Sequence, residues 1–340
     1  MTFPPETGPK TAAPSRPGEF DLIARYFAPM AGKGGLGLLD DAALLTPPVG
    51  HDLVLSKDAL VAGVHFFADD PPETIARKAL RVNLSDIAAK GAAPLGFLLG
   101  LGLPDDWTED WLAGFASGLA ADSAHFRCPL LGGDTVKAGE RLFLSITVLG
   151  SLPSGTMVRR SGGRAGDILY ISGVIGASTL GLSLRLDPAA AWARDVSETM
   201  RENVRRSYLV PDPASALAEV IRNHARAAMD ISDGLIGDAM KLAIASGTGI
   251  EIDARKVPLP PGFQRIIQRD PDLLEQILTG GDDYQVLAAI PPHLAAFFEK
   301  EALKAGMPVT AIGKLTSSGI RVISLDGGML SLARHSFRHF

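Results

Sequence analysis

Hydrophobic and polar positions follow two different periods along this chain, and its first half shows both. Apolar residues recur at helical spacing between residues 72 and 92. A second helical stretch follows Thr108, a favourable N-cap, and reaches Phe126. Between these two stretches, the nearly continuous apolar run Leu95–Leu103 has the length of a buried strand. The pattern predicts two helices that pack on a sheet.

Shorter patterns complete the expected first domain. Residues 19–30 show the apolar spacing of a helix, and residues 60–67 show no clear period and are expected to be irregular. Short apolar runs beside turn residues predict four further strands, at residues 42–45, 52–56, 129–131 and 142–149. We therefore expect a strand-rich, mixed α/β first domain.

A turn-rich segment at residues 151–164, with Pro153 and Arg159-Arg160, is typical of a domain boundary. A second α/β pattern follows, with strands expected at 167–172, 228–231 and 285–290 and helices at 176–186, 213–225 and 235–245. The expected division is a disordered tail at residues 1–18, a first domain at 19–152 and a second at 153–340. The Pro-rich tail lacks the apolar segment of a signal peptide or membrane anchor.

Composition narrows the classes of partner. A chain of 340 residues with 46% hydrophobic content favours two cores over one. The net charge of −5, without a face-sized basic cluster, argues against a nucleic-acid binder. Cys128 is the single cysteine, so no intrachain disulfide is available, which fits a reducing, cytoplasmic compartment. We expect a small-molecule partner.

Candidate chemistry lies in short acidic segments. Two unit charges at close range repel by roughly 4 kcal/mol near a protein surface, so carboxylates gathered by the fold need cations. The histidines are scattered, and oxygen ligands alone suit Mg²⁺ or Ca²⁺ rather than zinc. Neighbouring glycines admit phosphate oxygens to the backbone, which favours Mg²⁺ with a polyphosphate. Most of the nine aspartates adjoin glycine, serine or another aspartate: Asp40, Asp41, Asp58, Asp86, Asp134, Asp230, Asp233, Asp282 and Asp283.

Two of these segments have a plain structural alternative. Ser232-Asp233-Gly234 precedes the expected helix 235–245, where free N–H groups would seat a metal–phosphate complex. The same residues also suit an ordinary N-cap. Asp86 lies on the expected helix 72–92, either facing a site together with Asn83 or as a solvated charge. Both alternatives stay open at the level of single motifs.

Taken in order, the motifs resemble those of the thiamine-monophosphate kinases, from residue 18 to residue 340. This family is part of the aminoimidazole-ribonucleotide synthetase superfamily. The resemblance implies an N-terminal α/β domain with a mixed sheet that dimerises, a C-terminal α+β domain, and ATP in the cleft between them. It is carried by Asp40-Asp41, Asn83-Leu84-Ser85-Asp86, Gly132-Gly133-Asp134-Thr135, Asp230-Ile231-Ser232-Asp233-Gly234 and Gly280-Gly281-Asp282-Asp283-Tyr284.

The resemblance also implies a reaction: Mg²⁺-assisted, in-line transfer of a phosphoryl group from ATP to thiamine monophosphate (TMP), which yields thiamine diphosphate. The acceptor phosphate is already ionised at neutral pH, so no general base is needed. By resemblance, the Mg²⁺ ligands are Asp41, Ser56, Asp58, Asp86, Asp134, Asp230 and Asp233. The ATP contacts would be Gly133, Asp134, Arg160 and Ser232, and the TMP contacts His65, Asp282 and Phe337. Asp134, Asp233 and Arg160 would be the catalytic residues.

Some of these positions have other interpretations or depart from the family. A histidine between Val64 and Phe66 is typical of a packed residue, and an arginine in a turn is typical of solvated surface. Leu39 stands where the family has glycine, and Lys57 stands where it has threonine. An ammonium group cannot ligate Mg²⁺, so Lys57 would neutralise phosphate charge or leave ligation to a backbone oxygen.

Two further departures lie near the C-terminus. Asp282 stands where the family commonly has glutamate, which shortens the side chain and leaves its charge. The family's Gly-Tyr-Asp-His-Phe pattern appears as Ser336-Phe337-Arg338-His339-Phe340. Phe337 would then stack on an aromatic ring or simply pack the tail.

Other functions stay open beside the kinase. A sibling synthetase would share the metal cleft, although the relatives that need an N-terminal or C-terminal cysteine do not fit a chain whose one cysteine is Cys128. P-loop kinases are excluded because no Gly-x-x-x-x-Gly-Lys-Ser/Thr motif is present. A metal-dependent phosphatase and an inactive nucleotide-binding scaffold remain as alternatives.

Overall fold

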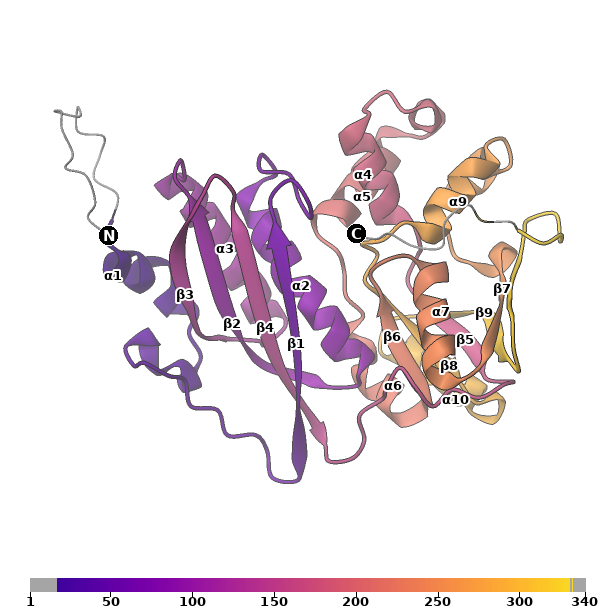
Figure 1. Ribbon diagram of the computed structural model, residues 1–340, viewed down its shortest axis with the longest axis horizontal. Helices are drawn as coiled ribbons and strands as arrows, with labels where there is room; N and C mark the ends of the chain where they lie inside the picture. Colours follow the sequence, from indigo (N-terminus) through magenta and orange to yellow (C-terminus); the bar gives the residue numbers. More distant parts are fainter. Residues whose placement is uncertain (1–16, 331, 333–340) are drawn as a thin grey trace, which may run out of the picture.

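Two sheets with their own helices lie side by side in the computed structural model (Figure 1). The structure describes residues 17–330 and 332. The first sheet has four strands in the order β1-β4-β2-β3, and all neighbours are antiparallel except β2 and β3. Its strands are β1 (His51–Val61), β2 (Ala93–Pro104), β3 (Leu130–Gly139) and β4 (Phe143–Pro153).

Helices α2 (Pro72–Ala89) and α3 (Glu109–His125) cover one face of this sheet (Figure 1). The hydroxyl oxygen of Thr108 accepts the N–H of Trp111 at 3.1 Å, which caps α3 as the sequence predicts. Helix α2 is buried on most sides because it contacts β1 and β4 on one side and α5, α6, β6 and β8 on the other. It therefore forms the joint between the two halves.

The second sheet has six strands in the order β10-β7-β9-β5-β8-β6 and is antiparallel except between β10 and β7. Alternate residues of β5 enter different cores, Leu169 and Ile171 on one face and Tyr170 on the other, so both faces are covered by helices. Its strands are β5 (Ile168–Ser172), β6 (Ala227–Ile231), β7 (Gly249–Asp253), β8 (Gln285–Ile290), β9 (Val309–Thr316) and β10 (Ile320–Ile323).

Seven helices accompany the second sheet in the part of the chain that the structure describes. The core on one face receives residues of α4, α5, α7, α8 and α9, and the core on the other receives residues of α6 and α10. The helices are α4 (Ala177–Leu186), α5 (Glu198–Leu209), α6 (Ala218–His224), α7 (Leu235–Ser246), α8 (Phe263–Ile267), α9 (Pro271–Thr279) and α10 (Ala295–Lys304).

The structure corrects two sequence predictions in the first domain. Residues 42–45 form no strand, since their backbone is tied only by the N–H of Leu44 to the carbonyl of Gly34 at 2.8 Å. The helix expected at 19–30 is divided into a short α1 (Glu19–Leu22), a π turn (Ile23–Phe27) and a 3₁₀ turn (Ala28–Met30), which contains a proline. Among the described residues, no helix is long and apolar enough to cross a membrane.

Candidate functional site

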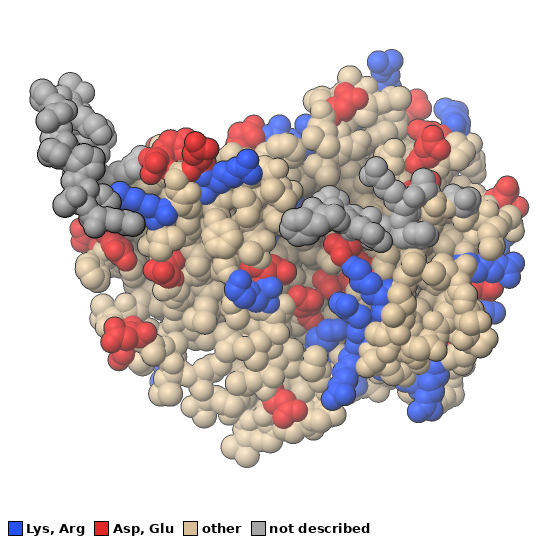
Figure 2. Space-filling view, viewed as in Figure 1, with Lys and Arg blue, Asp and Glu red and all other residues tan. Residues whose placement is uncertain are grey.

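A cleft of about 750 Å³ lies between the two halves. One wall comes from β1, α2 and the loop that follows β1, and the other comes from α4, α9, the end of β6 and the loop before β8. Figure 2 shows acidic and basic side chains close together on the surface between the halves. Seven of the sequence-predicted site residues line this cleft, namely Asp58, His65, Asp86, Asp230, Ser232, Asp233 and Asp282.

The first wall follows from the alternation of β1. Ser56 and Asp58 share the face of the buried Val54 and Leu60, which points toward α2. The hydroxyl of Ser56 donates to Oδ2 of Asp86 at 2.5 Å, and the N–H of Asp58 donates to Oδ1 of Asn83 at 2.9 Å. Asn83 and Asp86 lie one turn apart on α2, so the alternative in which Asp86 is a solvated helix charge does not hold.

The second wall is the turn after β6. Asp230 is nearly buried at the end of the strand. The N–H groups of Ser232 and Asp233 both donate to Oδ2 of the buried Asp238 at 2.9 Å. The ammonium of Lys241 contacts the carboxylate of Asp233 and lies 2.7 Å from Oδ1 of Asp238. The two N–H groups expected to bind phosphate are therefore engaged within the protein.

Burial and crowding disfavour negative charge in the cleft. Burial raises the pKa of Asp58 to about 6, and the charge of Asp86 adds to this effect. Burial also raises the pKa of Asp230 above its usual range, again with a contribution from Asp86. A cation placed beside these carboxylates would favour the ionised forms of Asp58 and Asp230.

A half-buried lysine lies within range of the charges of Asp230 and Asp86. Lys90 follows α2 and donates to the carbonyl of Ala228 at 2.8 Å, and burial lowers its pKa despite the charges of Asp230 and Asp86. Arg160 is exposed in the segment after β4, and its charge lowers the pKa of Lys90 further. Positive charge thus lies close to Asp230 and Asp86, although neither Lys90 nor Arg160, an expected ATP contact, is among the residues that line the cleft.

Residues 280–284, here called the acidic loop, complete the second wall. Asp282 and Tyr284 have left-handed backbone angles, with φ of 69° and 51°. Their N–H groups donate to the carbonyls of Ser232 and Ile231 at 2.9 and 2.8 Å. The carboxylate of Asp282 lies 2.8 Å from Nζ of Lys78 and accepts the hydroxyl of Tyr284 at 3.1 Å. The loop is therefore fixed against both β6 and α2.

His65 faces the acidic loop from the loop after β1. Its Nδ1 accepts the N–H of Val61 at 3.1 Å, which places the proton of a neutral ring on Nε2. The side chain is therefore held by a hydrogen bond within the protein, as expected for a packed histidine, and it also lines the cleft. Phe337, the third expected TMP contact, lies outside the described residues.

The remaining sequence-predicted residues lie on the opposite face of the first sheet. Across the sheet, Asp58 pairs with Ile146, Ile146 with Leu99, and Leu99 with Gly133. These four positions form one row, which is directed toward the helix-covered face. Asp134 is one residue further along β3 and therefore points to the other face. There, Asp41, Gly133 and Asp134 line a separate pocket of about 450 Å³. The expected metal ligands of one chain therefore lie in two separate groups, one in the cleft and one in the pocket on the opposite face of the first sheet.

Sequence reasoning missed Lys78, which lines the cleft, and Asp238 and Lys241, which hold the Ser232-Asp233 turn beside it. Lys78 is buried on α2, and no motif in the sequence singles it out. Asp238 and Lys241 lie in the first two turns of α7, at spacings that reach back to the Ser232-Asp233 turn. In residues 17–330 and 332, no three His, Cys, Asp or Glu side chains converge to form a ready-made metal site.

Comparison with known proteins bears directly on this arrangement. Two families match the chain: "AIR synthase related protein, N-terminal domain" at residues 39–152, and "AIR synthase related protein, C-terminal domain" at residues 164–325. The thiamine-monophosphate kinase of Caulobacter vibrioides is 43% identical over 309 residues, which are 89% of this chain and 85% of the relative. That of Escherichia coli K12 is 35% identical over 331 residues, or 95% and 98% of the two chains.

The chain belongs to the thiamine-monophosphate kinase family.

Solved structures agree with this membership. The crystal structure of thiamine-monophosphate kinase from Stenotrophomonas maltophilia superposes with a TM-score of 0.77 at 34% identity and covers 85% of this chain and 90% of its own. The structure of AaThiL complexed with AMPPCP and TMP has a TM-score of 0.74 at 31% identity, with 95% and 97% covered. The family and the two-domain fold class predicted from the sequence are confirmed.

The fold alone extends to a sibling group. Escherichia coli HypE, a hydrogenase maturation protein, has a TM-score of 0.74 but is only 20% identical to this chain. A likeness at that level shows a common architecture and does not transfer an activity. The sibling synthetase was one of the alternatives left open by the sequence. This likeness supports only a shared fold and gives no support to a synthetase activity.

Proposed function

We propose that the protein transfers the γ-phosphoryl group of ATP to thiamine monophosphate and forms thiamine diphosphate. Membership of the family supports this thiamine-phosphate kinase activity. The observation that carries it in this chain is the cleft between the halves, where Asp58 and Asp86 face Asp230 across the domain boundary. Such a cleft brings two anionic substrates together only with compensating cations.

The cations we propose are Mg²⁺ ions. The raised pKa values of Asp58 and Asp230 fit a site that awaits a cation, and Mg²⁺ characteristically uses one or two carboxylates together with substrate phosphates. When bound, Mg²⁺ neutralises charge on the phosphate oxygens and orients them for in-line transfer. From this cleft the residues that would hold it are Ser56, Asp58, Asp86, Asp230 and Asp233.

The substrates would lie against different walls. Arg160, with Lys90 behind it, offers positive charge to the phosphate chain of ATP at the rim beside Asp230. Asp282 and His65 both line the cleft. The thiazolium ring of TMP is cationic, so the Asp282 carboxylate suits it. No side chain has to remove a proton, since the acceptor phosphate is already ionised.

The second group of acidic residues fits a homodimer. The face of the first sheet that carries Asp134 also exposes large apolar side chains, and solvent-exposed apolar patches of this kind mark interaction surfaces. We propose that a second copy of the chain covers this face and brings the pocket of Asp41, Gly133 and Asp134 to an interface. The exposed apolar residues are Leu53, Leu55, Leu98, Val136 and Phe143.

The proposal is tested by incubating the protein with Mg-ATP and either TMP or free thiamine. We expect thiamine diphosphate and ADP in equal amounts from TMP alone, and no product with EDTA, with Asp134→Asn or with Asp86→Asn. Asp106→Asn, an exposed position after β2, is the matched control and should keep full activity. ADP without thiamine diphosphate would indicate a phosphatase or sibling reaction, and ATP binding without turnover would indicate a scaffold.

A further inference from the structure

One face of α2 carries three polar residues that point into the C-terminal half. Lys78, Arg81 and Ser85 are spaced by three and four positions, which places them along one side of the helix. All three are buried, with 3%, 6% and 0% of their surfaces exposed. Buried charges are costly unless they are paired, so the partners of these residues indicate the structural role of this face of α2.

Two of the three contact the acidic loop directly. The ammonium of Lys78 lies 2.8 Å from Oδ2 of Asp282, and the hydroxyl of Ser85 donates to the carbonyl of Tyr284 at 3.2 Å. Asp282 and Tyr284 hold the left-handed angles described above, which cost energy for residues with a side chain. The loop therefore depends on contacts from outside its own sequence.

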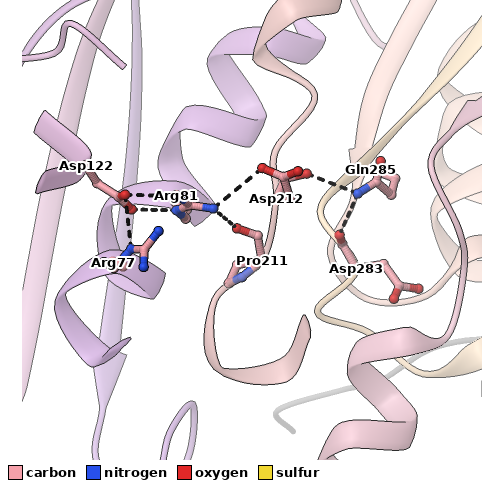
Figure 3. Close-up of polar contacts among 7 residues, drawn as sticks. All are labelled: Arg77, Arg81, Asp122, Pro211, Asp212, Asp283 and Gln285. Atoms are coloured by element: carbon pink, nitrogen blue, oxygen red, sulfur yellow. Dashed lines mark hydrogen bonds and ion pairs between the residues drawn. The ribbon is translucent and has the colours of Figure 1, made fainter. Parts of the chain in front are cut away.

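Arg81 reaches the loop through an intermediate segment, which Figure 3 shows. Its Nη1 donates to the carbonyl of Pro211 at 2.8 Å and lies 3.5 Å from Oδ1 of Asp212. The side-chain amide of Gln285 then donates to the carbonyl of Asp212 at 3.1 Å and to that of Asp283 at 3.3 Å. A continuous polar path thus runs from α2 to the middle of the acidic loop.

The far end of this path is also fixed. The buried carboxylate of Asp283 accepts the N–H of Gly176 at 2.7 Å, just before α4 begins. The other amide atom of Gln285, Oε1, accepts the hydroxyl of Ser172 at 2.8 Å at the end of β5. Asp283 and Gln285 therefore join the acidic loop to the C-terminal sheet, and residues 211–212 contact the loop through the side chain of Gln285.

Asp122 on α3 holds Arg81 in the orientation that this path needs. Its carboxylate binds the guanidinium in two places, with Nε–Oδ2 at 2.5 Å and Nη2–Oδ1 at 3.0 Å. Arg77 also donates to Asp122, at 3.1 Å, but this contact stays within the N-terminal half (Figure 3). The two arginines share one carboxylate, and Arg81 adds the connection to the C-terminal half.

We propose that Arg81 is a positioning residue for the phosphoryl acceptor: by holding residues 211–212, it fixes the acidic loop so that Asp282 is presented to TMP. This inference rests on the proposed function for the identity of the acceptor. The fixed loop itself is a property of the structure and can be measured without substrate.

The experiment compares Arg81→Met and Arg81→Lys with Arg77→Met as the matched control. Hydrogen exchange of the peptide that spans residues 276–288 should become at least severalfold faster in both Arg81 variants and stay unchanged in Arg77→Met. The KM for TMP should rise roughly tenfold, the effect of one lost hydrogen bond to a charged group, while the KM for ATP stays within about twofold. Arg81→Lys keeps a positive charge beside Asp122, so it decides the matter should Arg81→Met fail to fold.

Unchanged exchange of this peptide in both Arg81 variants would overturn the inference. Equal effects of Arg77→Met and Arg81→Met would also overturn it, because the cause would then be Asp122 alone. Equal increases in the KM values for TMP and ATP would show a general change in the cleft and would likewise contradict it. If the unmodified protein does not phosphorylate TMP, the proposed function fails, and the exchange result still decides whether Arg81 fixes the loop.

Discussion

Asp58 is the cleft carboxylate whose charge state should be easiest to observe. Its pKa is about 6 in the folded chain against an ordinary value of 3.8, so the folded state binds a proton more tightly than the unfolded state. Stability therefore falls as the pH rises from about 4 to about 6, and the full cost is present above that range. The shift corresponds to at most about 3 kcal/mol.

Asp58→Asn should therefore stabilise the metal-free protein. We expect the free energy of unfolding to rise by about 1 to 3 kcal/mol at pH 7.5 and by almost nothing below pH 4, since both states are then protonated. Urea unfolding at several pH values in EDTA measures this, with Asp106→Asn as control. A destabilised Asp58→Asn variant at pH 7.5 would show that the carboxylate is already compensated within the chain.

Mg²⁺ should offset the cost that the buried carboxylates of Asp58 and Asp230 impose on the folded chain. A ligand at a hundred times its Kd stabilises by about 2.7 kcal/mol, which corresponds to a Tm increase of several degrees. We expect this increase when Mg²⁺ and a non-hydrolysable ATP analogue are added to the protein, and a much smaller one for Asp86→Asn. Thermal unfolding with and without EDTA measures the effect; equal increases in both proteins would remove Asp86 from the ligand set.

Single residues of the cleft were predictable where a motif carries them and not where their partners are distant in sequence. Asp58, Asp86 and Asp230 each lie beside a recognisable signal, the end of a strand or a polar pair on a helix. Lys78 gives no such signal for its role, because Asp282 lies two hundred and four positions away along the chain. At the turn that begins with Ser232, the sequence predicted N–H groups free to bind phosphate. In the structure the N–H of Ser232 donates to Asp238, a partner that the motif did not indicate.

At the scale of elements, the acidic loop and the turn after β6 are packed as closely as backbone allows. A methyl group on Gly281 would lie 2.2 Å from the carbonyl oxygen of Ser232, far inside contact distance. Gly281→Ala must therefore move the loop away from β6.

We expect Gly281→Ala to lower the free energy of unfolding by about 2 kcal/mol and to weaken TMP binding. The matched control is Gly132→Ala on β3, where the new methyl group would meet only Leu98, at 3.5 Å, and the change should stay within about 0.5 kcal/mol. Chemical unfolding and TMP titration measure the two effects. A stable Gly281→Ala protein with normal TMP affinity would show that the loop is not held in this position.

Element types were predictable wherever one period dominates. Helix α3 and its Thr108 cap agree with the expectation, as do β8 and the helix after Gly234. The strand predicted at residues 42–45 is wrong, although these residues are apolar enough for one. A strand also needs a neighbouring strand with free backbone hydrogen-bonding groups. Whether such a neighbour exists is a property of the whole fold and cannot be seen in a local pattern.

For the whole molecule, the open face of the first sheet predicts the oligomeric state. Leu55 is 61% exposed at the centre of β1 and lies opposite Leu149 of β4. A charge there should oppose burial against a second copy, so Leu55→Lys should elute as a monomer where the unmodified protein elutes as a dimer. Leu303→Lys on α10, at a position equally exposed on the C-terminal half, is the control. Identical elution of all three proteins would exclude this face as the interface.

The separation of Asp134 from Asp58 shows what sequence order cannot convey about the whole site. Both residues belong to motifs of one family, yet the alternation of neighbouring strands places them on opposite faces of a sheet. Predicting this requires the register of four strands, which depends on pairings up to one hundred residues apart. The motif residues could therefore be named from the sequence, while their division between two faces of the sheet could not be predicted.

The face of α2 that holds Lys78, Arg81 and Ser85 contacts the acidic loop and Pro211 in the C-terminal half. The two halves are therefore not expected to be exchangeable between relatives at the predicted boundary near residue 153. A recombination event that exchanged only the C-terminal half would bring in a loop fitted to another helix. Functional chimaeras of this family should therefore exchange α2 together with the C-terminal half that it contacts.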